Sequence, residues 1–177
     1  MSERLTKSDW LEHGLRTLAK DGANALKVGP LSASLKVSRG SFYWHFHDLA
    51  DFRAQLLRSW QERTTDQVIQ DLDGTAEPDR LKHLMRRAFN VKPRLEQAIR
   101  SWAAEDDEVA ALVAAVDDRR VAHIAKLLVA AGVEGQRALD RAAFIYWAYL
   151  GQATVMDPRH SAIAAPALED ISHLFER

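Results

Sequence analysis

The most conspicuous chemistry of this sequence lies in the stretch VSRGSFYWHFHD, residues 37–48, which holds four aromatic side chains and two histidines. Such side chains could ligate a metal, fill a core, or contact a flat, charged surface such as a nucleic acid. His45 and His47 are two residues apart, so on a helix they point in different directions, whereas ligand pairs are normally spaced three or four apart. The spacing therefore argues against a metal site. Burial in a core and contact with a charged surface are the interpretations that stay open.

The composition is that of a chain that can bury a substantial core. Of 177 residues, 47% are hydrophobic and 28% are charged, which is typical of one or two globular domains in water. No apolar run approaches the length of a membrane helix, and the first residues lack the apolar centre of a secretion signal. The absence of cysteine excludes disulfides, thiolate ligands and cysteine nucleophiles. We therefore expect a cytoplasmic protein without a cofactor.

A small charge asymmetry separates the beginning of the chain from the rest. Residues 1–48 contain seven Lys or Arg and five Asp or Glu, a balance of +2, within a chain whose formal charge is −1. The remaining residues therefore carry −3. This split weakly favours contact between the N-terminal part and a polyanion.

Apolar residues recur at spacings of three and four along most of the chain, which predicts an all-α protein. The predicted helices span about residues 6–21, 28–36, 39–46, 48–72, 80–91, 94–102, 109–131, 137–156 and 161–176. The helix over residues 137–156 is apolar nearly all round, so it must be covered on more than one side, and the last helix can supply part of the cover. The long helix after Asp48 is predicted to connect an N-terminal unit to the rest. We therefore divide the chain into a first domain, residues 1–48, and a second, residues 49–177.

Several polar and glycine residues are placed to begin or end these helices. Thr6 or Ser8 can cap the first helix, Ser38 the third, and Asp48 the long one, because their side-chain oxygens can accept hydrogen bonds from first-turn amides. Gly22 and Gly132 follow the last periodic residues of two helices, where glycine commonly ends a helix.

Two short helices joined by a tight turn and preceded by a longer amphipathic helix are the layout of a helix-turn-helix. In that geometry the second helix lies in the DNA major groove, and small residues in its first turn allow a close approach. Phe42 and Phe46 are expected to face inward, and for Trp44 both burial and exposure are open. The expected DNA contacts are Lys27, Lys36, Ser38, Arg39, Gly40, Ser41, Tyr43, Trp44 and His45.

The stretch LSASLKVSRGSFYWHFHDLADF resembles the DNA-binding domain of the tetracycline-repressor (TetR) family of bacterial transcription regulators. The family pattern has Val-Ser, a small pair, and then Phe or Leu followed by Tyr-x-His-Phe. The matching residues are Val37, Ser38, Gly40, Ser41, Phe42, Tyr43, His45 and Phe46. The resemblance covers residues 5–57 by motif and the rest by layout. It implies a repressor, homodimeric through its last two helices, that a small-molecule ligand releases from a palindromic double-stranded DNA operator.

Three positions depart from the family pattern. Lys36 stands where glycine is usual, and a side chain there costs on the order of 1 kcal/mol if the backbone needs a positive φ. Lys27 and the pair Gly29-Pro30 replace a capping residue and residues that often face phosphates, and Leu49 replaces a Lys or Arg. These departures predict weaker or more salt-sensitive operator binding. They also leave open a degenerate member that dimerises but binds DNA weakly or not at all.

The second domain is expected to hold the ligand, because the resemblance implies a pocket inside its helical bundle. The candidate ligand-binding residues are Phe89, Trp102, His123, Tyr146 and Tyr149. Core packing or dimer contact is the alternative for these aromatics. A small helical metal-binding protein or enzyme is the alternative of another class. The sequence has no glycine-rich phosphate loop, serine elbow or His-x-x-x-His pair, so we expect no enzyme.

Overall fold

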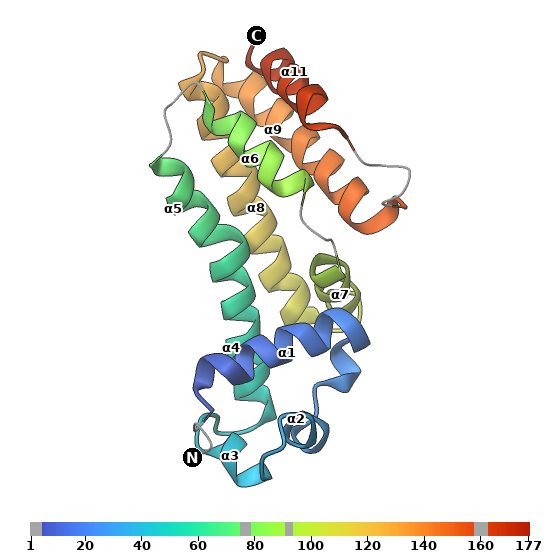
Figure 1. Cartoon of the computed structure of the whole chain (residues 1–177). Coiled ribbons are helices and arrows are strands. Elements are labelled where there is room, and N and C mark those ends of the chain that lie inside the picture. The colour runs from blue at the N-terminus through green and yellow to red at the C-terminus, as the bar shows by residue number, and fades with distance from the viewer. Residues whose placement is uncertain (1–4, 75–78, 91–93, 158–162) are drawn as a thin grey trace. The chain divides into compact units, whose positions relative to one another are not determined.

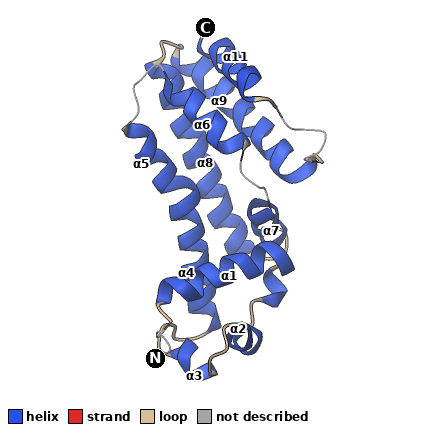
Figure 2. Cartoon of the chain, viewed as in Figure 1, coloured by secondary structure: helices blue, strands red, loops and turns tan. Residues whose placement is uncertain are grey.

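The computed structural model describes residues 5–74, 79–90, 94–157 and 163–177, and these residues contain helices and no strand (Figure 2). This confirms the predicted all-α class. The α-helices, labelled in Figure 1, are α1 Lys7–Asp21, α2 Val28–Ser34, α3 Arg39–Tyr43, α4 Leu49–Gln61, α5 Gln67–Asp73, α6 Arg80–Phe89, α7 Arg94–Ala103, α8 Asp107–Ala130, α9 Gly135–Leu150 and α11 Ala165–Glu176. None of the described helices is both long and apolar enough to span a bilayer.

The chain divides into two compact units. Unit 1 comprises Met1–Thr64 and Arg94–Ala110, and unit 2 comprises Thr65–Pro93 and Ala111–Arg177. Unit 1 therefore contains α4 and α7 in addition to the first three helices. The predicted functional boundary after residue 48 stays a prediction.

The first helix of unit 1 begins with a reciprocal cap. The hydroxyl of Thr6 accepts a hydrogen bond from the backbone N–H of Asp9 at 3.2 Å, and the Asp9 carboxylate accepts one from the Thr6 N–H at 2.7 Å. Both bonds satisfy amides that have no partner within the helix. The helix ends at Gly22, whose φ of 79° lies in the left-handed region. The cap is thus Thr6, one of the two predicted candidates.

A cluster of aromatic rings forms the core around the helix-turn-helix. Phe42 is fully buried, and its ring centroid lies 5.4 Å from that of Trp10, 5.1 Å from Phe46 and 5.4 Å from Phe52. Such tilted and edge-to-face pairs stabilise a core beyond the area they bury. The prediction that Phe42 and Phe46 face inward is confirmed.

Helices α1 and α4 pack closely where Gly14 faces α4. A methyl group on Gly14 would lie 2.6 Å from Cζ of Phe52 and 2.8 Å from Cδ1 of Leu56. The predicted cap of α4 is confirmed, because the Asp48 carboxylate accepts from the N–H of Asp51 at 2.8 Å. The apolar row Phe52, Leu56 and Trp60 is fully buried.

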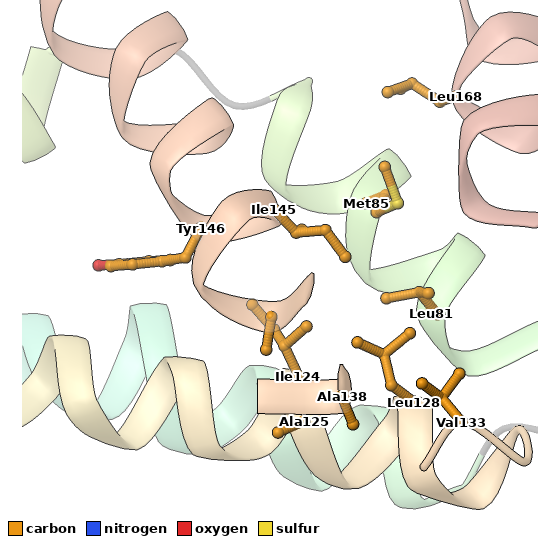
Figure 3. Close-up of a cluster of buried hydrophobic side chains, with 11 residues drawn as sticks. Leu81, Met85, Ile124, Ala125, Leu128, Val133, Ala138, Ile145, Tyr146 and Leu168 are labelled. Carbon is orange, nitrogen blue, oxygen red and sulfur yellow. The ribbon is translucent and has the colours of Figure 1, made fainter. Parts of the chain in front are cut away.

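The core of unit 2 combines side chains from α6, α8, α9 and α11, which point toward one another in Figure 3. Its buried members are Leu81, Met85, Ile124, Ala125, Leu128, Val133, Ala138, Ala142, Ile145, Tyr146 and Leu168. Polar contacts reinforce this packing at its edge. Lys82 on α6 forms an ion pair with Glu169 on α11, and Arg141 on α9 donates to the carbonyl oxygen of Phe175 at 2.6 Å.

Two predicted helices are interrupted by π-helical turns. The helix predicted over 48–72 consists of α4, the turn Glu62–Asp66 and α5, and the helix predicted over 137–156 ends at Leu150 and continues as the turn Gly151–Val155. In addition, α9 is not covered all round, since Phe144 and Trp147 are 58% and 66% exposed. The buried residues of α9 pack with α6, α8 and α11 in the core of unit 2, and further cover for its exposed side stays a prediction.

Candidate nucleic-acid interface

Helix α2 ends in a hydrogen-bonded turn that reverses the chain toward α3. The N–H of Lys36 donates to the carbonyl of Ala33 at 3.1 Å, and the N–H of Val37 donates to the carbonyl of Ser32 at 3.0 Å. These two bonds are those of a Schellman motif, which places its penultimate residue in the left-handed region. Lys36 accordingly has φ 58°, where a side chain costs about 1–2 kcal/mol. The suspected positive φ at this position is confirmed.

Helix α3 is shorter than predicted, and its predicted cap is wrong. It spans only Arg39–Tyr43, and the Ser38 side chain accepts no capping hydrogen bond. The backbone carbonyl of Ser38 accepts instead, from the N–H of Ser41 at 3.0 Å. The chain then continues as a turn in which the N–H of Phe46 bonds to the carbonyl of Phe42 at 3.1 Å. This turn buries Phe46 beside Phe42 without extending the helix.

The last residue of α3 and the residue that follows it present two large aromatic side chains to solvent. Tyr43 is 58% exposed and Trp44 is 74% exposed. Gly40, in the first turn of α3, is exposed as well. The exposure of Trp44 decides between the two interpretations that its sequence position left open. Ser41 is half-buried. Aromatic side chains that are exposed to this degree can contact another molecule.

Three cations of the motif are without partners in the folded chain. Lys27, Lys36 and Arg39 are exposed, and in the part of the chain that the structure describes they form no hydrogen bond or ion pair. The Arg39 guanidinium lies against the first turn of α2, where a methyl group on Gly29 would come within 3.1 Å of its Nη2. Gly29 thus leaves space for the arginine, which gives this departure from the family pattern a structural role.

His45 is used inside unit 1 rather than left free at the surface. It is half-buried, and its Nε2 shares a hydrogen bond with the carbonyl oxygen of Leu5 at 2.9 Å. The Lys7 ammonium lies 5.6 Å from the centroid of the Phe46 ring, a cation–π contact. Together these contacts fasten the start of α1 to the end of α3. The predicted contact between His45 and DNA stays a prediction.

The second histidine of the stretch belongs to the start of α4. Nδ1 of His47 lies 2.9 Å from Oδ2 of Asp48, and this hydrogen bond raises the pKa of His47 above its usual value. The pKa of Asp48 is lowered, chiefly by the backbone hydrogen bond from Asp51. Over the described ranges, no group of three or more His, Asp or Glu side chains could hold a metal ion. The His45–His47 pair therefore gains no further ligand there.

In unit 2, three of the five predicted ligand-binding residues lie together. The Tyr146 and Tyr149 rings stack with centroids 5.8 Å apart, and the Phe89 ring meets Tyr149 edge to face at 6.3 Å. His123 and Trp102 are elsewhere. Trp102 belongs to unit 1, where the Arg53 guanidinium lies 5.8 Å from its ring centroid. Burial lowers the pKa of the half-buried His123, and its Nε2 finds no hydrogen-bond partner among the described residues.

A polar network beside these rings was missed by the sequence prediction. The Tyr146 hydroxyl donates to Oδ1 of Asp117 at 2.5 Å and accepts from Nη1 of Arg120 at 3.2 Å. Nε of Arg120 donates to the hydroxyl of buried Thr65 at 2.9 Å. Burial raises the pKa of Tyr146, so the hydroxyl stays protonated. The available signal was Arg120 itself, a charged residue on the apolar stripe between Val116 and Ile124.

Solved structures of other proteins share this fold, and two of them align with nearly the whole chain. A protein described as a "TetR/AcrR family member" aligns with 96% of this chain and 97% of its own, with a TM-score of 0.78 and 20% sequence identity. A "TetR-family transcriptional regulator from Rhodococcus sp." aligns with 99% of this chain and 97% of its own, with a TM-score of 0.68 and 17% identity. No family model and no curated protein match the sequence. The predicted resemblance is thus confirmed as a shared fold.

Proposed function

We propose that this chain, which has the fold of TetR-family regulators, is a sequence-specific DNA-binding transcription regulator and not an enzyme. The observation that carries the proposal is the region of α3, where Tyr43 and the following Trp44 are exposed and the motif's cations form no hydrogen bond or ion pair with the described residues. Unpaired lysine and arginine side chains bind phosphates and release counterions, which supplies sequence-independent affinity. Donors on a helix within the major groove supply the sequence preference.

Within this proposal the residues of the motif have different roles. Gly40 and Ser41 allow α3 to approach the groove closely, because they add little bulk to its first turn. Arg39 can reach a guanine edge or a phosphate, and Tyr43 and Trp44 contact the backbone with their donors and ring edges. Lys27 and Lys36 contact phosphates. His45 and Ser38 lie at the ends of α3, where their contacts depend on the position of the duplex.

A second copy of this chain is the proposed partner of the exposed apolar face of α9 and α11. Phe144 and Trp147 on α9 and Leu174 on α11 are exposed, and the Phe144 ring lies 5.9 Å from that of Phe175. Apolar surface of this extent usually marks an interface. In a symmetric dimer the same patch faces itself. The two α3 helices of the dimer then match a palindromic operator with half-sites about 34–36 Å apart, or somewhat further.

If this face forms the dimer interface, a charge at its centre should strongly weaken dimerisation. Trp147→Asp is expected to weaken dimerisation at least about thirtyfold, because a carboxylate would be buried without a partner at two symmetric positions. Sedimentation equilibrium measures the change. Trp44→Asp, at the exposed tryptophan that follows α3, is the matched control and should leave the dimer intact. Equal dimerisation of both variants would contradict the assignment of this face.

A small-molecule effector is the proposed regulator, and unit 2 is its proposed site. The buried ring of Tyr146 stacks on Tyr149, and the half-buried rings of Tyr149 and Phe89 offer an apolar contact beside the polar network. An effector that binds one dimer conformation better than another shifts the population toward it, by no more than its differential affinity. Release from the operator, and hence repression, follows if the favoured conformation mismatches the half-site spacing.

The DNA-binding proposal is tested by selection from a pool of random duplexes at low salt. We expect recovery of a palindromic site, and we expect Tyr43→Ala to weaken binding to that site about tenfold in fluorescence anisotropy. The urea midpoint of the variant should match the wild type, since Tyr43 is mostly exposed. A wild-type protein without sequence preference would instead support the alternative of a degenerate member that dimerises without reading DNA.

A further inference from the structure

Lys36 occupies a backbone conformation that this chain otherwise gives to glycine. Helix α1 is followed by Gly22 with φ 79° and α8 by Gly132 with φ 96°, whereas α2 is followed by Lys36 with φ 58°. Across the described ranges, Lys36 is the only residue other than glycine with a positive φ. A non-glycine residue in this region is a local source of strain.

The turn after α8 shows that the backbone geometry does not require a lysine. In this turn the N–H of Gly132 donates to the carbonyl of Val129, and the N–H of Val133 donates to the carbonyl of Leu128, both at 3.0 Å. These are the same two bonds, counted from the helix end, that Lys36 and Val37 make after α2 at 3.1 and 3.0 Å. Glycine therefore makes the same helix end without the steric cost of a side chain.

The Lys36 side chain has no compensating contact within the fold. It is exposed, and no hydrogen bond or ion pair involves its ammonium among the residues the structure describes. Its position is the turn that joins α2 to α3, three residues before Arg39. A strained residue whose side chain has no polar contact with the described residues is best explained by a contact with another molecule.

We propose that Lys36 is a DNA phosphate contact whose placement on the left-handed turn lowers the stability of the fold. The inference rests on the proposed DNA-binding function and extends it, because it assigns part of the affinity to a residue that weakens folding. The contact is with the backbone and not with a base, since an ammonium on a flexible stem carries a point charge without fixed geometry.

The test separates backbone strain from charge with three substitutions at one position. Lys36→Gly removes the backbone strain and the charge, and Lys36→Arg keeps the strain and the charge. Lys36→Asn removes the charge and places at this position a residue that tolerates a positive φ. Lys20→Gln is the matched control, an exposed lysine in the last turn of α1. Urea midpoints are measured for each variant. Affinity for the labelled duplex recovered by selection is measured by anisotropy across a range of salt concentrations.

We expect Lys36→Gly to raise the urea midpoint by about 0.5 M. We also expect both Lys36→Gly and Lys36→Asn to weaken binding about fivefold per protomer at 0.15 M salt and to reduce the slope of log K against log salt by about 0.9 per contact. Lys36→Arg and Lys20→Gln should match the wild type in affinity and slope. Wild-type binding that Lys36→Asn leaves unchanged would overturn this inference alone, whereas a wild type that binds no duplex would overturn the proposed function with it.

Discussion

Replacement of Phe42 by alanine is expected to lower the free energy of unfolding by about 3–5 kcal/mol. The Phe42 ring is fully buried and contacts the rings of Trp10, Phe46 and Phe52 with centroids 5.1 to 5.4 Å apart. Truncation would leave a cavity lined by rigid aromatic rings from α1, α4 and the turn after α3, which cannot close without moving those elements. Urea denaturation followed by far-ultraviolet circular dichroism measures the loss.

The neighbouring residue provides a control at the same place in the sequence. Tyr43 is 58% exposed, so Tyr43→Ala should change the free energy of unfolding by no more than about 0.5 kcal/mol. The two variants thus separate folding from DNA binding. Phe42→Ala should lower the free energy of unfolding, whereas Tyr43→Ala should lower only the affinity for DNA. Equal stability losses for the two variants would contradict the orientation of α3.

The second large effect is expected at the closest approach between α1 and α4. A Cβ on Gly14 would lie 2.6 Å from Cζ of Phe52 and 2.8 Å from Cδ1 of Leu56, and neither side chain has free space in a buried core. Gly14→Val is therefore expected to destabilise the protein by about 3 kcal/mol or more, at the upper end of overpacking effects. Gly14→Ala should cost about 1–3 kcal/mol, although alanine itself favours a helix by about 1 kcal/mol over glycine.

Gly135 is the matched control for this steric argument. It is the first residue of α9, and an added Cβ would meet no atom within 4 Å. Gly135→Ala should therefore leave the thermal midpoint unchanged or raise it slightly. A Gly14→Ala variant as stable as Gly135→Ala would show that α1 and α4 are not in the tight contact described.

The parts of the fold that the sequence predicted are those specified by neighbouring residues. The Thr6 and Asp48 caps and the ends at Gly22 and Gly132 depend on atoms within a few positions of the helix end, so their residue types identify them. The inward orientation of Phe42 and Phe46 follows from a spacing of four residues. The positive φ of Lys36 was indicated by the family pattern, which has glycine at this position, and not by the lysine itself.

The parts that were missed depend on departures from regular geometry or on distant partners. A period of 3.6 residues assumes α-helix throughout, so the π-helical turn over Glu62–Asp66 shows in sequence only as a weakening of the apolar row after Trp60. The Ser38 side chain makes no capping hydrogen bond, contrary to the sequence prediction, because α3 is a single short turn that the Ser38 backbone carbonyl closes. The partners of Tyr146, which are Asp117 and Arg120, lie 29 and 26 positions away in the chain.

The distribution of tryptophans gives the chain an optical label at each of its two proposed interfaces. Trp10, Trp60 and Trp102 are buried, whereas Trp44 directly after α3 and Trp147 on α9 are largely exposed to water. An indole that passes from water into an apolar contact shifts its emission to shorter wavelengths, and one that stacks on a nucleic acid base is quenched. Dimerisation and DNA binding would therefore leave different signatures in the intrinsic fluorescence of the unlabelled protein, one from each exposed indole.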